Sequence, residues 1–169
     1  MIKITSRTGL AILLTVLCSV SKQLNACSLV PLLEAFEANH TEALAPVKPH
    51  FKLAGIERGS DDGNLGSCSD FGFITFKLSG SYPPQGYIFE RVKGEFEDRL
   101  FEPVAVIPSK FIDDNALFTF VWLDGSSNEQ EPIHFTVSIV AVNGAGERSE
   151  PQYLEVRHPG VASPWWQFW

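Results

Sequence analysis

The chain has 169 residues, with 13 Lys or Arg against 20 Asp or Glu and a formal net charge of −7. This length allows one domain with appended segments, and the acidic balance argues against a nucleic-acid partner, because phosphate binding needs a basic face. A hydrophobic share of 44% that includes 13 Phe is enough for a core, which excludes a wholly disordered chain.

Residues 1–26 have the layout of a secretory signal peptide. Lys3 and Arg7 precede an apolar run over residues 9–20, and a polar stretch over residues 21–26 follows. The apolar run is too short to span a bilayer. We therefore expect export to the periplasm or cell envelope, with cleavage between residues 21 and 26. Removal of residues 1–26 leaves 10 basic against 20 acidic residues, a net charge of −10.

The number of cysteines in the mature protein depends on that cleavage. Cys18 leaves with the signal, so Cys27 and Cys68 remain. Two cysteines in an oxidising compartment predict a Cys27–Cys68 disulfide that ties the N-terminal segment to the domain. Residues 24–27 also resemble a bacterial lipobox, in which Cys27 carries a lipid anchor. The disulfide is the first expectation, the lipid anchor is the alternative, and two free thiols are the third case.

Residues 27–49 are predicted to be a linker. Residues 31–38 can form two helical turns that begin with Pro31 at the first helical position. Pro46 and Pro49 end any helix and stiffen the approach to the domain.

From residue 50 onward the apolar residues alternate with a period of two, which predicts strands. The first strand is expected at residues 51–59, and a loop rich in Gly, Ser and Asp covers residues 58–70. Further strands are predicted at residues 71–78, 87–92, 103–107, 116–123, 133–142 and 153–156, of which the stretch at 103–107 is the weakest. Seven short strands separated by turn residues predict an all-β, seven-stranded sandwich.

The alternation also predicts which side chains face inward. Within the second, third and sixth predicted strands, the residues of one face are Ile74, Phe76 and Leu78, then Tyr87 and Phe89, then Phe135, Val137, Ile139 and Ala141.

Residues 135–151, FTVSIVAVNGAGERSEP, hold an aromatic residue, alternating apolar residues, a Gly-rich loop, and then Ser149 and Pro151. This segment resembles the sixth strand, the following loop and the start of the seventh strand of a fibronectin type III domain. Residues 84–90, PQGYIFE, resemble the turn before the third strand and that strand itself. The resemblance covers residues 48–158 and implies a fibronectin type III-like domain at residues 50–158, followed by a Pro- and aromatic-rich tail at residues 159–169.

Three positions depart from that family. Phe135 stands where the family has a tyrosine, whose hydroxyl bonds to the preceding corner. The connection over residues 123–135 is longer than the family's turn, and Phe76 replaces a tryptophan. A generic immunoglobulin-like sandwich is the broader class that remains.

No catalytic or metal-binding constellation is expected. The four histidines are scattered without metal-ligand spacing, and there is no nucleophile elbow or phosphate-binding loop. His134 is out of phase with Phe135 and should face solvent. The loop that holds Asp61, Asp62, Asn64 and Asp70 lacks the ligand spacing of a calcium loop, so we interpret it as a solvated turn. No cofactor or bound metal is expected.

Two segments are candidates for partner contacts. The first is the Gly-rich loop after the sixth strand, because a rigid hairpin holds such a loop out at one end of a sandwich; its residues are Asn143, Gly144, Ala145, Gly146, Glu147 and Arg148. The second is the tail, where aromatic side chains follow Pro159 and Pro164; they are Trp165, Trp166, Phe168 and Trp169. The tail either docks in a partner's groove or at a membrane, or folds back on the sandwich.

The sequence therefore predicts a non-catalytic, exported binding module of the cell envelope that acts through its loops and its aromatic tail. Its partner is a protein or envelope component that the sequence does not name. The alternative is a structural or assembly component of an envelope or secretion complex, anchored through Cys27.

Overall fold

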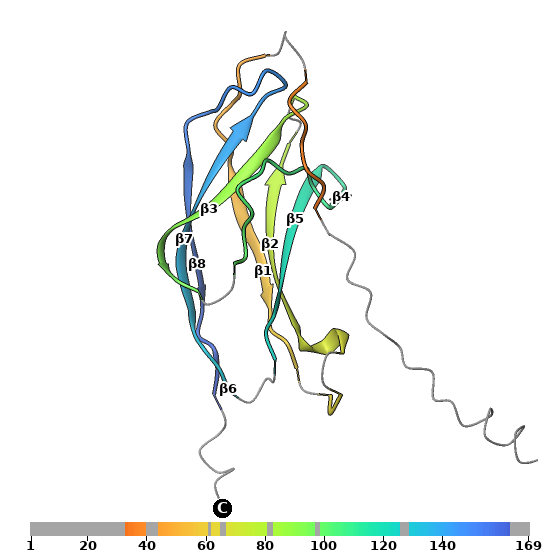
Figure 1. Ribbon diagram of the computed structural model, residues 1–169, viewed down its shortest axis with the longest axis vertical. Coiled ribbons are helices and arrows are strands. Elements are labelled where there is room, and N and C mark those ends of the chain that lie inside the picture. The colour runs from red at the N-terminus through yellow and green to blue at the C-terminus, as the bar shows by residue number, and fades with distance from the viewer. Residues whose placement is uncertain are drawn as a thin grey trace, which may run out of the picture.

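The computed structural model describes residues 33–39, 44–60, 62–64, 67–80, 83–96, 99–125 and 129–162. Over these ranges the chain is all-β, with seven strands in two antiparallel sheets that pack as a sandwich. The strands of both sheets run along the long axis of the molecule (Figure 1). The predicted all-β, seven-stranded sandwich is thereby confirmed.

The first sheet has four strands in the order β1-β2-β5-β4. Its members are β1 (Phe51–Glu57), β2 (Phe71–Ser79), β5 (Asn115–Leu123) and β4 (Lys110–Ile112). A short 3₁₀ turn, η1 (Cys68–Asp70), leads into β2.

The second sheet has three strands in the order β3-β7-β8. They are β3 (Gly86–Glu95), β7 (Ile133–Val142) and β8 (Gln152–His158). Two further strands of two residues each, β6 (Glu129–Gln130) and β9 (Val161–Ala162), pair with each other. They extend the sandwich at the end where β8 finishes (Figure 1).

Aromatic side chains fill the space between the two sheets. Phe89 of β3 lies 5.4 Å from Phe76 of β2 and 4.8 Å from Phe120 of β5, measured between ring centroids. The predicted inward residues of β2, β3 and β7 are all buried, which confirms the alternation. Burial of such rings is the main stabilising contribution that a fold of this size has available.

The side chain of Gln152 joins the two sheets by hydrogen bonds to the backbone of β1. The amide nitrogen of Gln152 donates to Phe51 O at 2.8 Å, and its amide oxygen accepts from Phe51 N at 2.6 Å. Gln152 opens β8 and Phe51 opens β1, so this pair of hydrogen bonds joins the edge strand of one sheet to the edge strand of the other.

The predicted strand at residues 103–107 is wrong. This segment forms no strand; Val106 makes isolated bridges to Tyr87 and Ala35, and the fourth strand is β4 instead. Pro103 and Pro108 have no backbone N–H, so the segment cannot support a continuous ladder. It runs instead along the outer edge of β3, where Val106 and Tyr87 exchange two backbone hydrogen bonds of 2.9 Å.

The predicted helix over residues 31–38 is also wrong for residues 33–38, the part that the structure describes. Phe36 N donates to Ala105 O at 2.7 Å, and Ile107 N donates to Glu34 O at 3.0 Å. These bonds hold the segment in an extended form beside residues 105–107. A short helix cannot compete because it is costly to nucleate and the extended backbone is already paired.

Gly94 allows β3 to lie close beside β7. Its φ is +84°, and a Cβ at this position would lie 2.4 Å from His134 O and 2.8 Å from Phe135 Cα. We expect Gly94→Ala to lower the free energy of unfolding by about 2–4 kcal/mol, because a left-handed φ and overpacking each carry a cost. Urea denaturation measures this loss.

Gly63→Ala is the matched control for Gly94→Ala. Gly63 has a φ of +79° with nothing within 4 Å of the added Cβ, so only the conformational cost of about 1 kcal/mol should remain. Equal losses in the two variants would show that the approach to β7 does not require glycine at position 94.

Candidate functional site

Three connections meet at one end of the sandwich, which we call the loop end. They are the β2–β3 connection, the turn between β4 and β5, and the β7–β8 loop (Figure 1). Gly80 N donates to Asp114 O at 3.1 Å, which ties the first two connections together. Asp113 takes a φ of +50° in the β4–β5 turn, a conformation that Asp tolerates better than most residues. The strands and this hydrogen bond thus fix the positions of the β2–β3 connection and the β4–β5 turn relative to each other.

A cleft of about 340 Å³ opens at the loop end, which we call the apolar cleft. Its walls come from the residue 33–39 segment, β2, β3, β4, β5 and the connections beside them. The largest side chains in the lining are Phe36, Leu78, Tyr87, Ile107, Phe111 and Phe118. None of the residues that line it carries a charge. A cleft of this size and chemistry suits an apolar side chain or a small apolar ligand.

Phe111 is the main exposed apolar residue of this cleft. It is 70% exposed although it belongs to a strand; β4 has only three residues and lies at the edge of its sheet. Ile112 beside it is also exposed. A large phenyl ring in water at the rim of an apolar cleft marks a surface that gains free energy when a partner covers it.

Gln85 places one polar group in the apolar cleft. Its side chain is buried, and Nε2 donates to Tyr87 Oη at 2.7 Å. Its Oε1 accepts no hydrogen bond from any residue in the described part of the chain. An unsatisfied buried oxygen costs about 1–3 kcal/mol, so Gln85 lowers the stability of the fold at this position.

The β7–β8 loop is held by Asn143, the first of the candidate contact residues. Asn143 Oδ1 accepts from Ala145 N at 3.0 Å and from Glu147 N at 2.9 Å, and Nδ2 donates to Leu44 O at 3.0 Å. Asn143 is 2% exposed and Gly144 is also buried. Both residues therefore determine the conformation of the loop and are not available for contact with a partner. The exposed part that a partner can touch is Ala145, Gly146, Glu147 and Arg148.

Several sequence predictions fall outside the described residues. Cys27, Trp165, Trp166, Phe168 and Trp169 all lie there, so the disulfide, the lipid anchor and the role of the tail stay predictions. Cys68 opens η1 at the end of the sandwich opposite the loop end (Figure 1).

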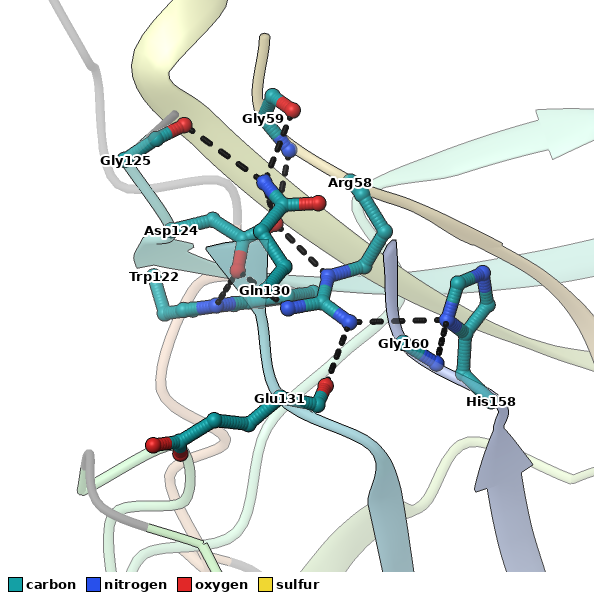
Figure 2. Close-up of polar contacts among 9 residues, drawn as sticks. All are labelled: Arg58, Gly59, Trp122, Asp124, Gly125, Gln130, Glu131, His158 and Gly160. Carbon is teal, nitrogen blue, oxygen red and sulfur yellow. Dashed lines mark hydrogen bonds and ion pairs between the residues drawn. The ribbon is translucent and has the colours of Figure 1, made fainter. Parts of the chain in front are cut away.

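A buried polar network occupies that opposite end (Figure 2). Arg58 and Asp124 form a two-point ion pair, with Nε to Oδ2 at 2.7 Å and Nη2 to Oδ1 at 2.8 Å. The side chains are 9% and 4% exposed. Asp124 also accepts from Gly59 N, Trp122 Nε1 and Gln130 Nε2. The network therefore ties the ends of β1 and β5 to β6.

The electrostatics of Asp124 indicate a structural role. Burial by itself would raise the pKa of its carboxyl group, but the hydrogen bonds from Arg58, Gly59 and Trp122 outweigh it and lower the pKa. A carboxylate that stays ionised and already accepts from four neighbours has no free lone pair for proton transfer. Sequence reasoning missed this pair, because 66 residues separate its members and neither stands in a motif.

His158 completes the network as a hydrogen-bond acceptor. Gly160 N donates to His158 Nδ1 at 3.1 Å, and Arg58 Nη1 lies 3.4 Å from the same nitrogen. Nδ1 is therefore unprotonated. Burial and then the charge of Arg58 lower the pKa of this imidazole.

We expect the stability of the protein to fall because of His158 as the pH drops below about 6.5. A lowered pKa in the folded state means that the unfolded chain binds the proton first, so stability is complete above the ordinary pKa of about 6.5 and is lost as the pH falls toward the lowered value. His158→Asn keeps an acceptor near the position of Nδ1 but cannot titrate. Urea midpoints measured from pH 5 to 8 should therefore vary less in His158→Asn; parallel curves would contradict the prediction.

The remaining polar predictions concern surface residues. His134 faces solvent as predicted, with a 61% exposed side chain, and its Nε2 lies 2.8 Å from Glu155 Oε1. Hydrogen bonds from Arg157 and His134 lower the pKa of Glu155 to about 2. In the acidic loop, Asp62 Oδ1 accepts from Asn64 N at 2.9 Å, a contact typical of a turn. Asp70 is buried, and its carbonyl oxygen accepts from Asp124 N and Gly125 N.

Within the described ranges, no three His, Cys, Asp or Glu residues are grouped so that they could hold a metal ion. No helix in the same ranges is long and apolar enough to cross a membrane.

A cleft of about 270 Å³ beside β3 and β5 also has a mostly apolar lining, but that lining includes Glu102. Two further clefts are more polar than the apolar cleft. One of about 320 Å³ lies beside β3 and includes Arg91, Arg99 and Arg148 in its lining. The other, of about 570 Å³, lies against the buried network and includes Arg58, Arg91, Glu95 and Asp124. The apolar cleft is the one among these whose lining includes no charged residue, and we therefore take it as the candidate site.

Comparisons of the chain with protein-family models, with curated proteins and with solved structures find no match. Its function is therefore inferred from the geometry described above.

Proposed function

We propose that this protein is a non-catalytic, exported interaction module that binds an apolar segment of another protein at the loop end of its sandwich. The observation that carries this proposal is the apolar cleft, whose lining includes no charged residue and whose rim exposes Phe111 by 70%. Exposed apolar patches beside a well-formed cleft are typical of protein-binding surfaces.

The topology supports an immunoglobulin-like form of this module. The order β1-β2-β5-β4 in one sheet and β3-β7-β8 in the other matches the strand order of a constant-type immunoglobulin sandwich. The fibronectin type III resemblance of residues 135–151 is a narrower form of the same proposal. In either form, loops at one end of a rigid sandwich are the usual binding elements.

The described polar groups support a role without catalysis. The side chains of Asp124 and Arg58 are buried and hydrogen-bonded to each other, and His158 accepts a hydrogen bond from the backbone of Gly160. An active site needs a nucleophile or base with a free lone pair beside a substrate cavity. These groups instead stabilise the end of the fold opposite the apolar cleft.

A photo-crosslinking amino acid at position 111 tests the proposal. The variant is expressed in the native host, irradiated in the intact envelope, and its crosslinked products are identified by mass spectrometry. We expect a defined protein adduct at position 111. The matched control is position 153, where Tyr153 is 64% exposed on β8. Equal labelling at the two positions would contradict a binding role for the apolar cleft.

An assembly role at a membrane is the second candidate. Residues 33–39 pack beside the apolar cleft, and Phe36 lines it. Cys27 lies only six residues before Leu33, a span of at most about 20 Å. A lipid on Cys27 would therefore hold the apolar cleft near the membrane surface. The mass of the mature N-terminus decides between this form and a soluble one, because a diacylglycerol adduct on Cys27 is required for the lipoprotein.

A further inference from the structure

We propose that the occupant of the apolar cleft is the aromatic segment 163–169 of a second copy of this chain. This inference rests on the proposed function and names its partner. It makes the protein an assembling subunit, in which each copy carries both a cleft and the segment that fills the cleft of the next copy.

The segment and the cleft are chemically complementary. Residues 163–169 read SPWWQFW, with four aromatic residues and none that is charged. The apolar cleft offers Phe36, Pro83, Tyr87 and the exposed Phe111 as surfaces for rings to pack against.

The segment cannot fill the cleft of its own chain. Tyr87 lines the apolar cleft and pairs with Ala141, whereas Ala162 pairs with Glu129, beyond the other end of β7. The eight residue steps from Ile133 to Ala141 alone span about 26 Å. Trp165 and Trp166 reach at most about 10–14 Å from Ala162, and fully extended Trp169 about 24 Å. Trp165 and Trp166 of one copy therefore fall short of its own apolar cleft.

The nearer cleft is a poor match for the same segment. The cleft of about 570 Å³ lies beside β6, within reach of residue 163, but its lining includes Arg58, Arg91, Glu95, Asp124 and Glu131. Covering these groups with indole rings would remove charged and polar atoms from water without replacing their hydrogen bonds. The apolar cleft carries no such penalty.

A contact between opposite ends of two copies is heterologous. Such contacts do not close after two copies unless the rotation between them forms a ring, so they generate chains of increasing length. We therefore expect the protein to form a concentration-dependent series of oligomers in which each copy follows the next head to tail.

The experiment uses the purified full chain in sedimentation velocity over a hundredfold range of concentration. The segment variant is Trp165→Ser with Trp166→Ser, and the cleft variant is Phe111→Lys, which changes an exposed side chain. Tyr153→Lys is the control, because it places the same charge on an exposed aromatic position away from the cleft. Circular dichroism confirms that each variant folds.

We expect the wild type and Tyr153→Lys to form the oligomer series, and each of the other two variants to be monomeric. An equimolar mixture of the segment variant and the cleft variant should then form a 1:1 dimer that grows no further. Only one intact segment and one intact cleft remain to meet in that mixture.

Three outcomes would overturn the inference. They are a monomeric wild type at every concentration, association that survives Phe111→Lys, and a mixture that stays monomeric. A monomeric wild type that still crosslinks another protein at position 111 would overturn the self-assembly but leave the proposed function standing. Absence of both the oligomers and the crosslink would remove both.

Discussion

Replacing Arg58 by Met is expected to lower the free energy of unfolding by about 3–5 kcal/mol. The change leaves Asp124, whose side chain is 4% exposed, as a buried carboxylate without its cation. It also removes the hydrogen bonds from Arg58 to Glu131 O and toward His158. Urea or thermal unfolding followed by circular dichroism measures the loss.

The exposed pair of Arg99 and Glu102 gives the matched control for Arg58→Met. These side chains lie 3.0 Å apart but are 71% and 63% exposed, so Arg99→Met should change stability by less than about 1 kcal/mol. The double variant Arg58→Met with Asp124→Leu should recover part of the loss, because no charge is then left buried. A loss of less than about 1 kcal/mol in Arg58→Met would show that the network at this end does not stabilise the fold.

Phe89→Ala is expected to lower the free energy of unfolding by a similar amount, about 3–5 kcal/mol, because packing is lost. The Phe89 ring lies within 6.1 Å of five others, measured between centroids; they belong to Phe51, Phe76, Phe101, Phe118 and Phe120. Truncation opens a cavity that residues of both sheets line, and packed rings cannot collapse into it fully. Chemical denaturation gives the change in unfolding free energy.

Phe111→Ala makes the same chemical change on the surface. Because Phe111 is 70% exposed, its truncation should alter stability by less than about 0.5 kcal/mol. Phe89→Leu should fall between the two variants, since it retains most of the volume. If Phe89→Ala were no worse than Phe111→Ala, the aromatic cluster would not be the core of the sandwich.

The sequence predicted the fold where the pattern is local. Alternation alone placed β2, β5 and β7 to within a residue or two and identified Phe76, Phe89 and Phe135 as inward residues. A period of two is imposed by the strand itself, so it can be recognised without knowledge of the pairing partner.

The errors arose where distant residues decide the structure. Residues 103–107 have strand-like composition, but their prolines limit them to one bridge on the edge of β3. Residues 33–38 could form helical turns, yet hydrogen bonds to residues 105–107 hold them extended. In both cases the deciding contact lies far away in the sequence, which local propensity does not report.

The candidate site was predicted only in part. The β7–β8 loop lies at one end of the sandwich, as the sequence predicted, and its role in partner contacts stays a prediction. Its first residue, Asn143, is buried and organises the loop. The apolar cleft could not be predicted, because its walls come from five separate stretches that meet only in the folded chain. No local pattern in the sequence identifies Phe111 as an exposed residue, because a phenylalanine on the surface cannot be told from one in the core by its residue type alone.

The two hydrogen bonds of Gln152 to Phe51 have a consequence for aggregation. An open sheet edge is a template on which strands of other molecules can add, as in amyloid growth. Gln152 caps the first residue of β1 against β8, and Val106 bonds to Tyr87 on the outer edge of β3. The edge at β4 is only three residues long and contains Lys110, which discourages stacking of further copies. These contacts oppose strand-to-strand addition at the sheet edges in a chain that contains 13 phenylalanines, and they leave the loop end free for other contacts.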